Sequence, residues 1–300
     1  MAHPAAAEGT HFPSRLLHTL RGLISAPFPL IGTLAFLGFL LLAIFGHQIA
    51  PYAFDDQDFD ARQPPDCALR VLNPFQQGCD HPFGTDNLGQ DVYSRVILGT
   101  QEVFRLAGLG TLLAVIIGTT IGLVIGYEGG LLDEVVARLL DSFLAMPALL
   151  LALVLLGSLG DAENSLFLVL IIVYAPIVAR VVRSNVLEIK TRGFVEAAQL
   201  RGETRFYILF REILPSVIPA LVVEASLRFS YGIFLVASLG FLGIGAHPPT
   251  PNWGLMVSDA RTWYSIAPWM LEYPAGAIVT LVIAVNLMSD GIRKLVQRSN

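Results

Sequence analysis

Charged residues are scarce in this sequence. Asp, Glu, Lys and Arg make up 14% of the 300 residues, whereas hydrophobic residues make up 54% and the mean hydropathy is +0.63. These values exclude an ordinary soluble domain and indicate an integral membrane protein. The useful unit in such a chain is a run of about 20 apolar residues, which is long enough to cross about 30 Å of hydrocarbon.

Motifs for catalysis and for nucleotide binding are also missing. The sequence contains no Gly-x-x-x-x-Gly-Lys-Ser/Thr stretch to hold phosphates, no nucleophile elbow and no zinc-protease motif. Its six histidines form no close cluster with cysteines or carboxylates of the kind that binds a metal. We therefore expect no enzymatic activity, no metal and no cofactor in this chain. Any ATP-driven step must then use a separate ATPase polypeptide.

Cysteine occurs only as Cys67 and Cys79, in a polar stretch at residues 51–100 that follows the first apolar run. This stretch is too short and too polar to form a large core of its own. In an oxidising compartment the two thiols could form a disulfide that closes a small loop and contributes about 2–3 kcal/mol. Two unpaired thiols are the alternative.

Six apolar runs are long enough to cross a membrane. The third begins in a mixed, charged stretch that we expect to lie against protein or at the membrane interface. Pro147, Pro176 and Pro219 lie inside spans or near their starts and predict kinks, because neighbouring helices can satisfy the freed carbonyls. The sequence thus predicts an all-α membrane protein with spans at residues 29–50, 103–127, 138–160, 165–187, 214–244 and 270–292.

The Lys and Arg residues predict how these spans are oriented. Most of the 19 basic residues fall on one side of the membrane if the six spans alternate in direction. The positive-inside rule then places both termini in the cytoplasm, with the loop 188–213 on the same side. We accordingly divide the chain into a cytoplasmic segment 1–28, a first transmembrane helix 29–50, an extracytoplasmic insert 51–100 and a membrane core 101–297.

A charged segment, EAAQLRGETRFYILFREILP at residues 196–215, interrupts the apolar runs. Small and apolar residues before Gly202 predict one short helix, and the aromatic residues after it predict a second helix that leads to Pro215. Gly202 permits a sharp turn between the two. Such a rigid projection is suited to docking in a groove of a partner protein. The alternative is a loop folded back on its own helix ends.

The spacing of this segment resembles the "EAA" loop of binding-protein-dependent ABC importer permeases. Glu-Ala-Ala is followed by three residues and Gly202, and Leu-Pro ends thirteen positions after that glycine. In that family the loop lies in a cleft of a cytoplasmic ATPase subunit and transmits its closure to the membrane helices. The resemblance implies ATPase-coupling roles for Glu196, Ala197, Ala198, Gly202 and Pro215.

Other stretches extend the resemblance to roughly residues 30–297. HPFGTDNLGQDVYSRVILG (81–99) and LGFLGIGAHPPTPNWGLMVSDAR (239–261) are similar to segments of the dipeptide/oligopeptide/nickel permease group, and the closest type is its "C" permease subunit. One departure is Gln90, which stands where Arg is common in that group. The resemblance implies a six-helix, type I importer permease fold with an extracytoplasmic insert between helices one and two.

The resemblance also implies an assembly in the inner membrane. The expected partners are a homologous B-type permease, two cytoplasmic ATPase subunits that would bind ATP and Mg, and an extracytoplasmic solute-binding protein. Membrane lipid would surround the complex, and we expect no nucleic acid partner. Di- or oligopeptides are the expected solutes. The alternatives are a transporter of the same group for nickel, opines, antimicrobial peptides or polyamine export, and a membrane scaffold without transport activity.

Two charges, Glu224 and Arg228, lie in the fifth span. They are four residues apart, so they share a helix face and can pair. Because charges inside a membrane are costly and usually face a bundle interior or a water-filled cavity, we expect this pair to line or gate the translocation path. An internal pair that fixes helix packing is the alternative. After this span, AHPPTPNWG (246–254) predicts a stiff segment that either contacts the external binding protein or caps the helix ends.

Overall fold

The computed structural model describes residues 27–57, 60–65, 80–160 and 163–299. Regular structure within these ranges is helical, apart from one β-bridge between Thr85 and Asp91, which confirms the all-α prediction. The helices are α2 (Pro27–Ile49), α3 (Val92–Val103), α4 (Gly110–Glu128), α5 (Gly130–Leu144), α6 (Ala148–Leu159), α7 (Glu163–Ile189), α8 (Gly193–Leu200), α9 (Arg205–Tyr207), α10 (Leu214–Phe241), α11 (Trp253–Ala260) and α12 (Trp269–Ser299). Three short segments of other helix types join them: η1 (Phe104–Leu109), η2 (Ile208–Ile213) and η3 (Arg261–Trp263).

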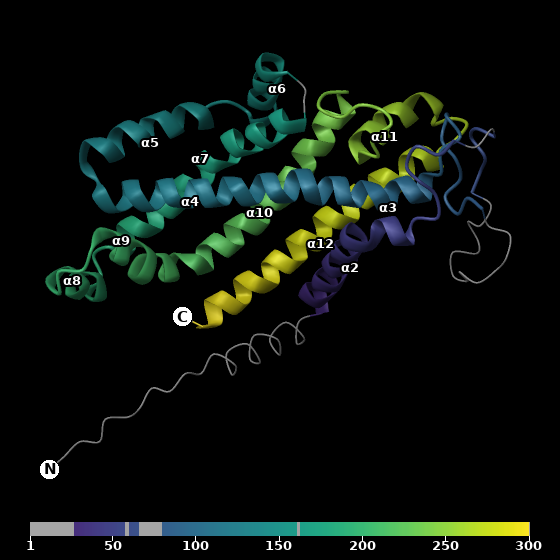
Figure 1. The fold of residues 1–300 in the computed structure, drawn as a ribbon. Helices are drawn as coiled ribbons and strands as arrows, with labels where there is room; N and C mark the ends of the chain where they lie inside the picture. The colour runs from purple at the N-terminus through teal and green to yellow at the C-terminus, as the bar shows by residue number, and fades with distance from the viewer. Residues whose placement is uncertain (1–26, 58–59, 66–79, 161–162, 300) are drawn as a thin grey trace, which may run out of the picture.

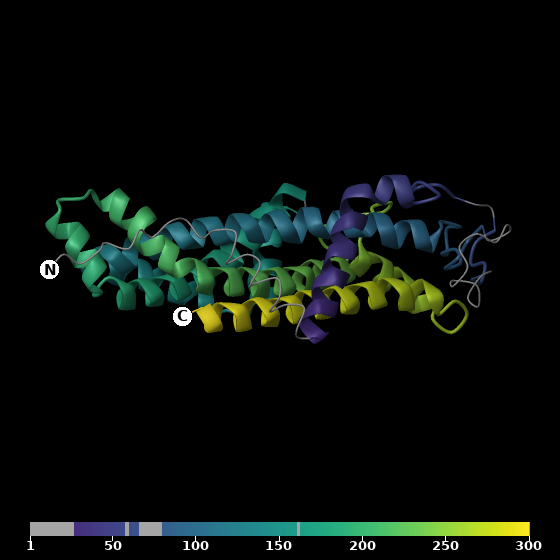
Figure 2. The same cartoon turned by 90° about the horizontal axis from the view of Figure 1, so that it is seen from below.

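The long helices form an elongated bundle. In Figures 1 and 2, α4, α7, α10 and α12 run along the length of the molecule, and α2 crosses α12. α8 and α9 lie at one tip, which we call the α8 end. α11, the start of α3 and residues 80–91 lie at the opposite tip, which we call the α11 end. α12 finishes toward the α8 end, and α2 begins near the middle of the bundle and runs toward the α11 end (Figure 1).

The closest helix pair in the bundle, α4 and α7, depends on small residues four positions apart. One face of α4 carries Gly110, Ala114, Gly118, Gly122 and Gly126. A Cβ atom added at Gly118 would lie 2.6 Å from the carbonyl oxygen of Ala175, and one at Gly122 would lie 2.5 Å from that of Ala179. Small side chains thus allow the two backbones to touch, as in other helix pairs within membranes.

Five of the predicted spans are continuous helices long and apolar enough to cross a membrane, judged over the described residues. The third, residues 138–160, is broken into two helices: α5 ends at Leu144, α6 begins at Ala148, and the two are bent by 93°, so the pair adds a sixth crossing when both helices count as one broken span. Pro147 causes the break, since proline disfavours a helical conformation in the residue before it. The five continuous spans are Pro27–Ile49, Val92–Glu128, Asn164–Ile189, Arg205–Phe241 and Trp269–Lys294.

Two carboxylates of the charged half of the third run contact protein, whereas its other charges, Glu134 and Arg138, are exposed. The Nη2 atom of Arg183 on α7 donates to Oδ2 of Asp133 on α5 over 2.8 Å, and Arg180 on α7 pairs with Asp141 on α5. These contacts fix α5 along α7, where Leu140 is buried in a cluster with Ala179, whereas Leu131, Val135 and Leu139 of α5 are exposed. The other two prolines, Pro176 and Pro219, lie inside helices that continue through them.

Two helices begin before their apolar runs. The helix containing α4 begins at Val92, because the side chain of Asp91 caps it by accepting a hydrogen bond from the Ser94 amide over 2.7 Å. The helix containing α10 begins at Arg205, where the Thr204 hydroxyl accepts from the Tyr207 amide. Hydrophobicity marks only the lipid-facing part of each helix, so the start of the first helix at Val92 was not predicted. The residues from Arg205 were predicted as a short helix before Pro215, but not as one continuous helix with the span.

Candidate functional site

α8 is the short helix that the Glu-Ala-Ala pattern predicts, and its side chains face two ways. Val195 and Ala198 are completely buried in an apolar cluster formed by the end of α7, η2 and the start of α10. Glu196 and Ala197 are exposed, and Leu200 is 89% exposed. The three residues of the motif therefore divide: Ala198 anchors the helix to the bundle, whereas Glu196 and Ala197 form part of an outward surface.

Gly202 ends α8 in a left-handed conformation, with φ of +76°. The Gly202 amide donates to the Gln199 carbonyl over 3.0 Å, and the Glu203 amide donates to the Ala198 carbonyl over 3.2 Å. This pair of bonds is the Schellman arrangement, which satisfies carbonyls at a helix end and usually requires glycine. The predicted sharp turn at Gly202 is confirmed, and the chain reverses there into α9.

The second predicted helix runs from α9 through η2 into α10. Pro215 occupies the first turn of α10 directly after the π-helical turn, where its missing N–H leaves the hydrogen-bond ladder one bond short. Phe206, 71% exposed, stacks beside Phe210 with ring centroids 4.5 Å apart. Leu200 is a further exposed apolar side chain at the α8 end. The sequence analysis placed all three residues on the predicted docking element, but it did not predict which of the apolar side chains of this element are exposed.

Polar contacts connect the α8 segment to the end of α4. Both carboxylate oxygens of Glu128 accept hydrogen bonds from Nη1 of Arg205 over 2.9 Å. Lys190, between α7 and α8, donates from Nζ to the Gly126 carbonyl over 2.9 Å. A force on α8 would therefore reach α4 and α7 through these contacts, and α10 through the continuous helix after Thr204.

The charged pair in α10 also exists as predicted. Nε of Arg228 lies 2.8 Å from Oε1 of Glu224, and both side chains are largely buried, with 14% and 12% of their surface exposed. The Arg228 guanidinium lies 5.0 Å from the ring centroid of Tyr231. Arg228 also lines a cavity of about 310 Å³ between α6, α7 and α10. The structure thus brings the two charges together near the middle of α10.

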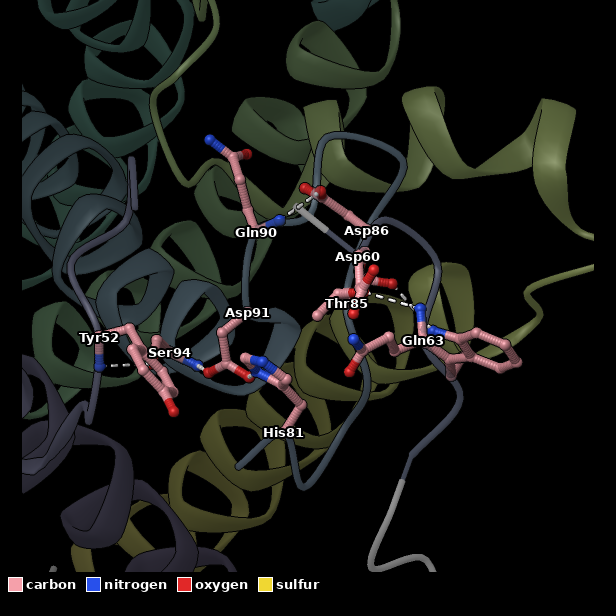
Figure 3. Close-up of polar contacts among 10 residues, drawn as sticks. Tyr52, Asp60, Gln63, His81, Thr85, Asp86, Gln90, Asp91 and Ser94 are labelled. Atoms are coloured by element: carbon pink, nitrogen blue, oxygen red, sulfur yellow. Dashed lines mark hydrogen bonds and ion pairs between the residues drawn. The ribbon is translucent and has the colours of Figure 1, made fainter. Parts of the chain in front are cut away.

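A second polar cluster lies at the α11 end, where residues before α3 fold onto its first turn (Figure 3). The Asp91 carboxylate caps α3 through one oxygen, and its other oxygen lies 3.0 Å from Nδ1 of His81. The Tyr52 amide donates to the Ser94 hydroxyl over 3.2 Å, and the Tyr52 ring lies beside the His81 ring. These contacts connect the chain after α2 to the start of α3.

Thr85 and Asp86 continue this cluster toward α12. The Trp269 indole at the start of α12 donates to the Thr85 carbonyl over 3.1 Å, and the Gln63 amide donates to the Thr85 hydroxyl over 2.8 Å. Burial raises the pKa of the Asp86 carboxyl above its ordinary value of 3.8, although the Gln90 amide and the Arg95 charge act against this shift. Gln90, the departure from the permease group, accepts a hydrogen bond from Arg95.

The predicted stiff segment 246–254 packs against the helix ends at this tip. Trp253 is 1% exposed and donates from its indole nitrogen to the Val96 carbonyl over 3.0 Å. The Asn252 side chain caps α11 by accepting from the amides of Gly254 and Leu255. These contacts favour the capping interpretation for its second half. The other predicted site at this end, the possible disulfide between Cys67 and Cys79, lies outside the described residues.

Comparison with known families identifies the chain. Residues 118–300 match the model of the family described as "Binding-protein-dependent transport system inner membrane component". The chain belongs to this family. It is therefore a multi-pass inner-membrane protein and a permease subunit of a binding-protein-dependent ABC transporter.

Curated relatives agree with this assignment over most of the chain. The "Dipeptide transport system permease protein DppC" of Alkalihalophilus pseudofirmus is 33% identical over 264 residues, which cover 88% of this chain and 83% of that protein. The "Glutathione transport system permease protein GsiD" of Escherichia coli O6:K15:H31 is 39% identical over 254 residues, which cover 85% and 80%. The permease is thus of the C-like type that the sequence motifs indicated.

A solved structure supports the fold. A chain of the MetNI methionine ABC transporter, in an inward-facing conformation, matches with a TM-score of 0.54 and 23% identity, covering 69% of this chain and 96% of that one. At this identity the likeness concerns the fold alone. It confirms the type I importer permease fold for the core of this protein.

Proposed function

We propose that this permease carries di- or oligopeptides into the cell in an ATP-driven importer, as the names of the DppC and GsiD relatives suggest. The observation that carries the coupling part of the proposal is the two-faced α8. Val195 and Ala198 fix this helix to the bundle, while Glu196, Ala197 and Leu200 face outward. A short helix held rigidly on one face and exposed on the other is suited to receiving a force from a partner.

The proposed orientation follows from charge. The α8 end and both termini lie in the cytoplasm, where basic residues gather, and the α11 end lies outside. Two ATPase subunits bind beneath the α8 end and hold ATP and Mg, so this chain itself needs no cofactor and catalyses no reaction. A B-type permease completes the path, and a solute-binding protein delivers the peptide at the α11 end.

The proposed mechanism is a shift between two access states. Closure of the ATPases on ATP pushes α8, and the contacts from Arg205 to Glu128 and from Lys190 to Gly126 carry the displacement to α4. The helix that continues from Arg205 to Phe241 carries it to α10. ATP and the loaded binding protein each favour the outward-open state, and hydrolysis returns the permease to the inward-open state. Glu224 and Arg228 lie on the path that opens and closes.

The test compares two exposed leucines in the reconstituted complex. Leu200→Asp places a charge on the proposed docking surface and should lower ATP-driven peptide uptake and ATPase co-purification by at least about tenfold, the effect of losing one central interface residue. Leu88→Asp makes the same change at the opposite tip, where Leu88 is 49% exposed, and should leave ATPase binding unchanged. Normal ATPase binding by the Leu200 variant would contradict the proposed docking.

The solute is tested separately. Uptake of a labelled tripeptide by the wild-type complex supports peptide import. A complex that hydrolyses ATP in response to its binding protein, but takes up only another class of solute, would assign the chain to a different transporter of the same group. A chain that co-purifies with no ATPase would support the scaffold alternative.

A further inference from the structure

The cavity beside Arg228 has the features of a solute site within the membrane. Its volume is about 310 Å³, and side chains from three helices line it, including Leu149 of α6, Tyr174 of α7, and Arg228, Tyr231 and Phe234 of α10. Arg228 is near the middle of α10, and therefore far from both tips of the bundle. The cavity thus combines one cationic group with aromatic and aliphatic walls.

Arg228 keeps hydrogen-bonding capacity in this cavity. Glu224 approaches its Nε atom, Tyr231 lies against the guanidinium, and Tyr174 lines the same cavity. A guanidinium carries five N–H donors, so one carboxylate on the Nε side leaves donors for a second acceptor. A charge at this depth is costly unless it faces protein or water. Arg228 meets this condition, because Glu224 lies on one side of it and the cavity on the other.

The surrounding surface shows that this region is not closed by the chain itself. Tyr231 is 55% exposed and Phe234 is 65% exposed, although both lie beside the buried charge pair. A pair that served only to fix helix packing would be enclosed by its own bundle. Here the pair borders an open face of α10, so the occupant of the cavity can enter from the path that this face would form with a second permease.

On the basis of the proposed function, we propose that Arg228 is a transient binding site for a carboxylate of the transported peptide, and that Glu224 is its counter-ion when the cavity is empty. A guanidinium matches the geometry of a carboxylate, which it can bind with two parallel hydrogen bonds. The apolar walls formed by Leu149 and Phe234 accommodate the uncharged part of the same solute.

Glu224 gives the site a property that a lone arginine lacks. It competes with the carboxylate of the solute for the same guanidinium, so it weakens binding. A site on a transport path must bind well enough to admit its solute and weakly enough to release it. Removal of the Glu224 charge should therefore tighten binding and slow release, which is a different effect from loss of the arginine.

The test uses the full complex in proteoliposomes with its binding protein, ATP and trialanine as the probe, either as the free acid or as the C-terminal amide. R228Q should lower uptake of the acid by about tenfold or more relative to the amide, the effect of one charge-assisted hydrogen bond. R228K should restore part of this difference. E224Q should lower both KM and kcat for the acid. Every variant uses the same binding protein. Any preference of the binding protein for the acid or the amide is therefore the same in each variant and cancels when the uptake ratios are compared.

Equal losses for the acid and the amide would overturn the carboxylate site and leave a packing pair. The double variant E224Q/R228Q leaves no unpaired buried charge, so it keeps the comparison available if R228Q does not assemble. Failure of the wild-type complex to take up either form of trialanine would instead contradict peptide import. The two failures are thus distinguishable.

A second measurement uses trialanine alone, so it does not depend on whether the binding protein delivers the C-terminal amide to the permease. R228C, in a chain with Cys67→Ser and Cys79→Ser, is treated with an aminoethyl or a sulfonatoethyl methanethiosulfonate, and R228S in the same chain is the control for other thiols. The cationic reagent should restore trialanine uptake and the anionic reagent should not, and trialanine should protect the cysteine. Lack of reaction, or equal effects of both reagents, would overturn the proposal.

Discussion

Glycine is required at position 202 because of the backbone conformation there, and not because a side chain would clash with its neighbours. Its φ of +76° is unfavourable for any residue with a Cβ atom, yet a Cβ at this position would meet no heavy atom within 4 Å. Gly193, at the other end of α8, also has open space around it and has an ordinary negative φ. The same helix thus provides a glycine that is required and one that is not.

We predict that Gly202→Ala weakens the end of α8 by about 1–2 kcal/mol, the cost of a left-handed conformation for a residue with a side chain. Amide hydrogen exchange in α8 should become about 5–30 times faster, and ATP-driven uptake should fall with it. Gly193→Ala should leave both unchanged. Equal exchange rates in the two variants would show that the turn at Gly202 is not what holds the helix.

For single residues, the sequence predicts features that depend on the local backbone, but not features that depend on packing against other helices. The turn at Gly202 follows from the glycine and the change of pattern around it, so it could be read directly. The opposite orientation of Ala197 and Ala198 could not, because it depends on the position of α7 and η2, which bury Ala198. The exposure of Leu200 was not predicted for the same reason.

Among the helices, the close contact between α4 and α7 depends on a repeat of small residues in α4. Every fourth residue from Gly110 to Gly126 is Gly or Ala, and the α7 backbone lies against this face. The repeat is visible in the sequence, but its partner helix is not. The bend between α5 and α6 is a different case. An apolar run of sufficient length predicts one crossing, and its length does not show that Pro147 divides the run into two helices.

We predict that Gly122→Ala destabilises the permease, because the new methyl group would lie 2.5 Å from the Ala179 carbonyl oxygen and 2.7 Å from Cβ of Val182. The expected cost is about 1–3 kcal/mol, typical of overpacking, and a lower thermal unfolding midpoint in nanodiscs would report it. Gly38→Ala in α2, where a Cβ meets nothing within 4 Å, should be neutral or slightly stabilising. A similar midpoint for both variants would argue that α4 and α7 can separate without cost.

At the scale of the whole molecule, the question is how a push at the α8 end reaches the membrane helices. The contact in which Nη1 of Arg205 donates to both carboxylate oxygens of Glu128 joins the α8 segment to α4, but 76% of the Arg205 side chain and 30% of the Glu128 side chain are exposed. Exposed pairs contribute about 0–1 kcal/mol to stability. The contact therefore matters little for folding, and its removal should appear in coupling.

We predict that Glu128→Gln leaves ATP hydrolysis and the unfolding midpoint near wild type. The number of peptides transported per ATP should fall by about two- to fivefold, the factor that corresponds to the free energy of one exposed ion pair. Arg205→Glu should have a similar or larger effect, because it places two carboxylates together. The double variant E128R/R205E restores the attraction with the charges exchanged and should recover most of the ratio. If each single variant transports normally, or if the exchange does not rescue, the Arg205–Glu128 contact does not carry the push. The push must then travel through the continuous Arg205–Phe241 helix and reach α4 through the Lys190–Gly126 contact and the close packing of α4 on α7.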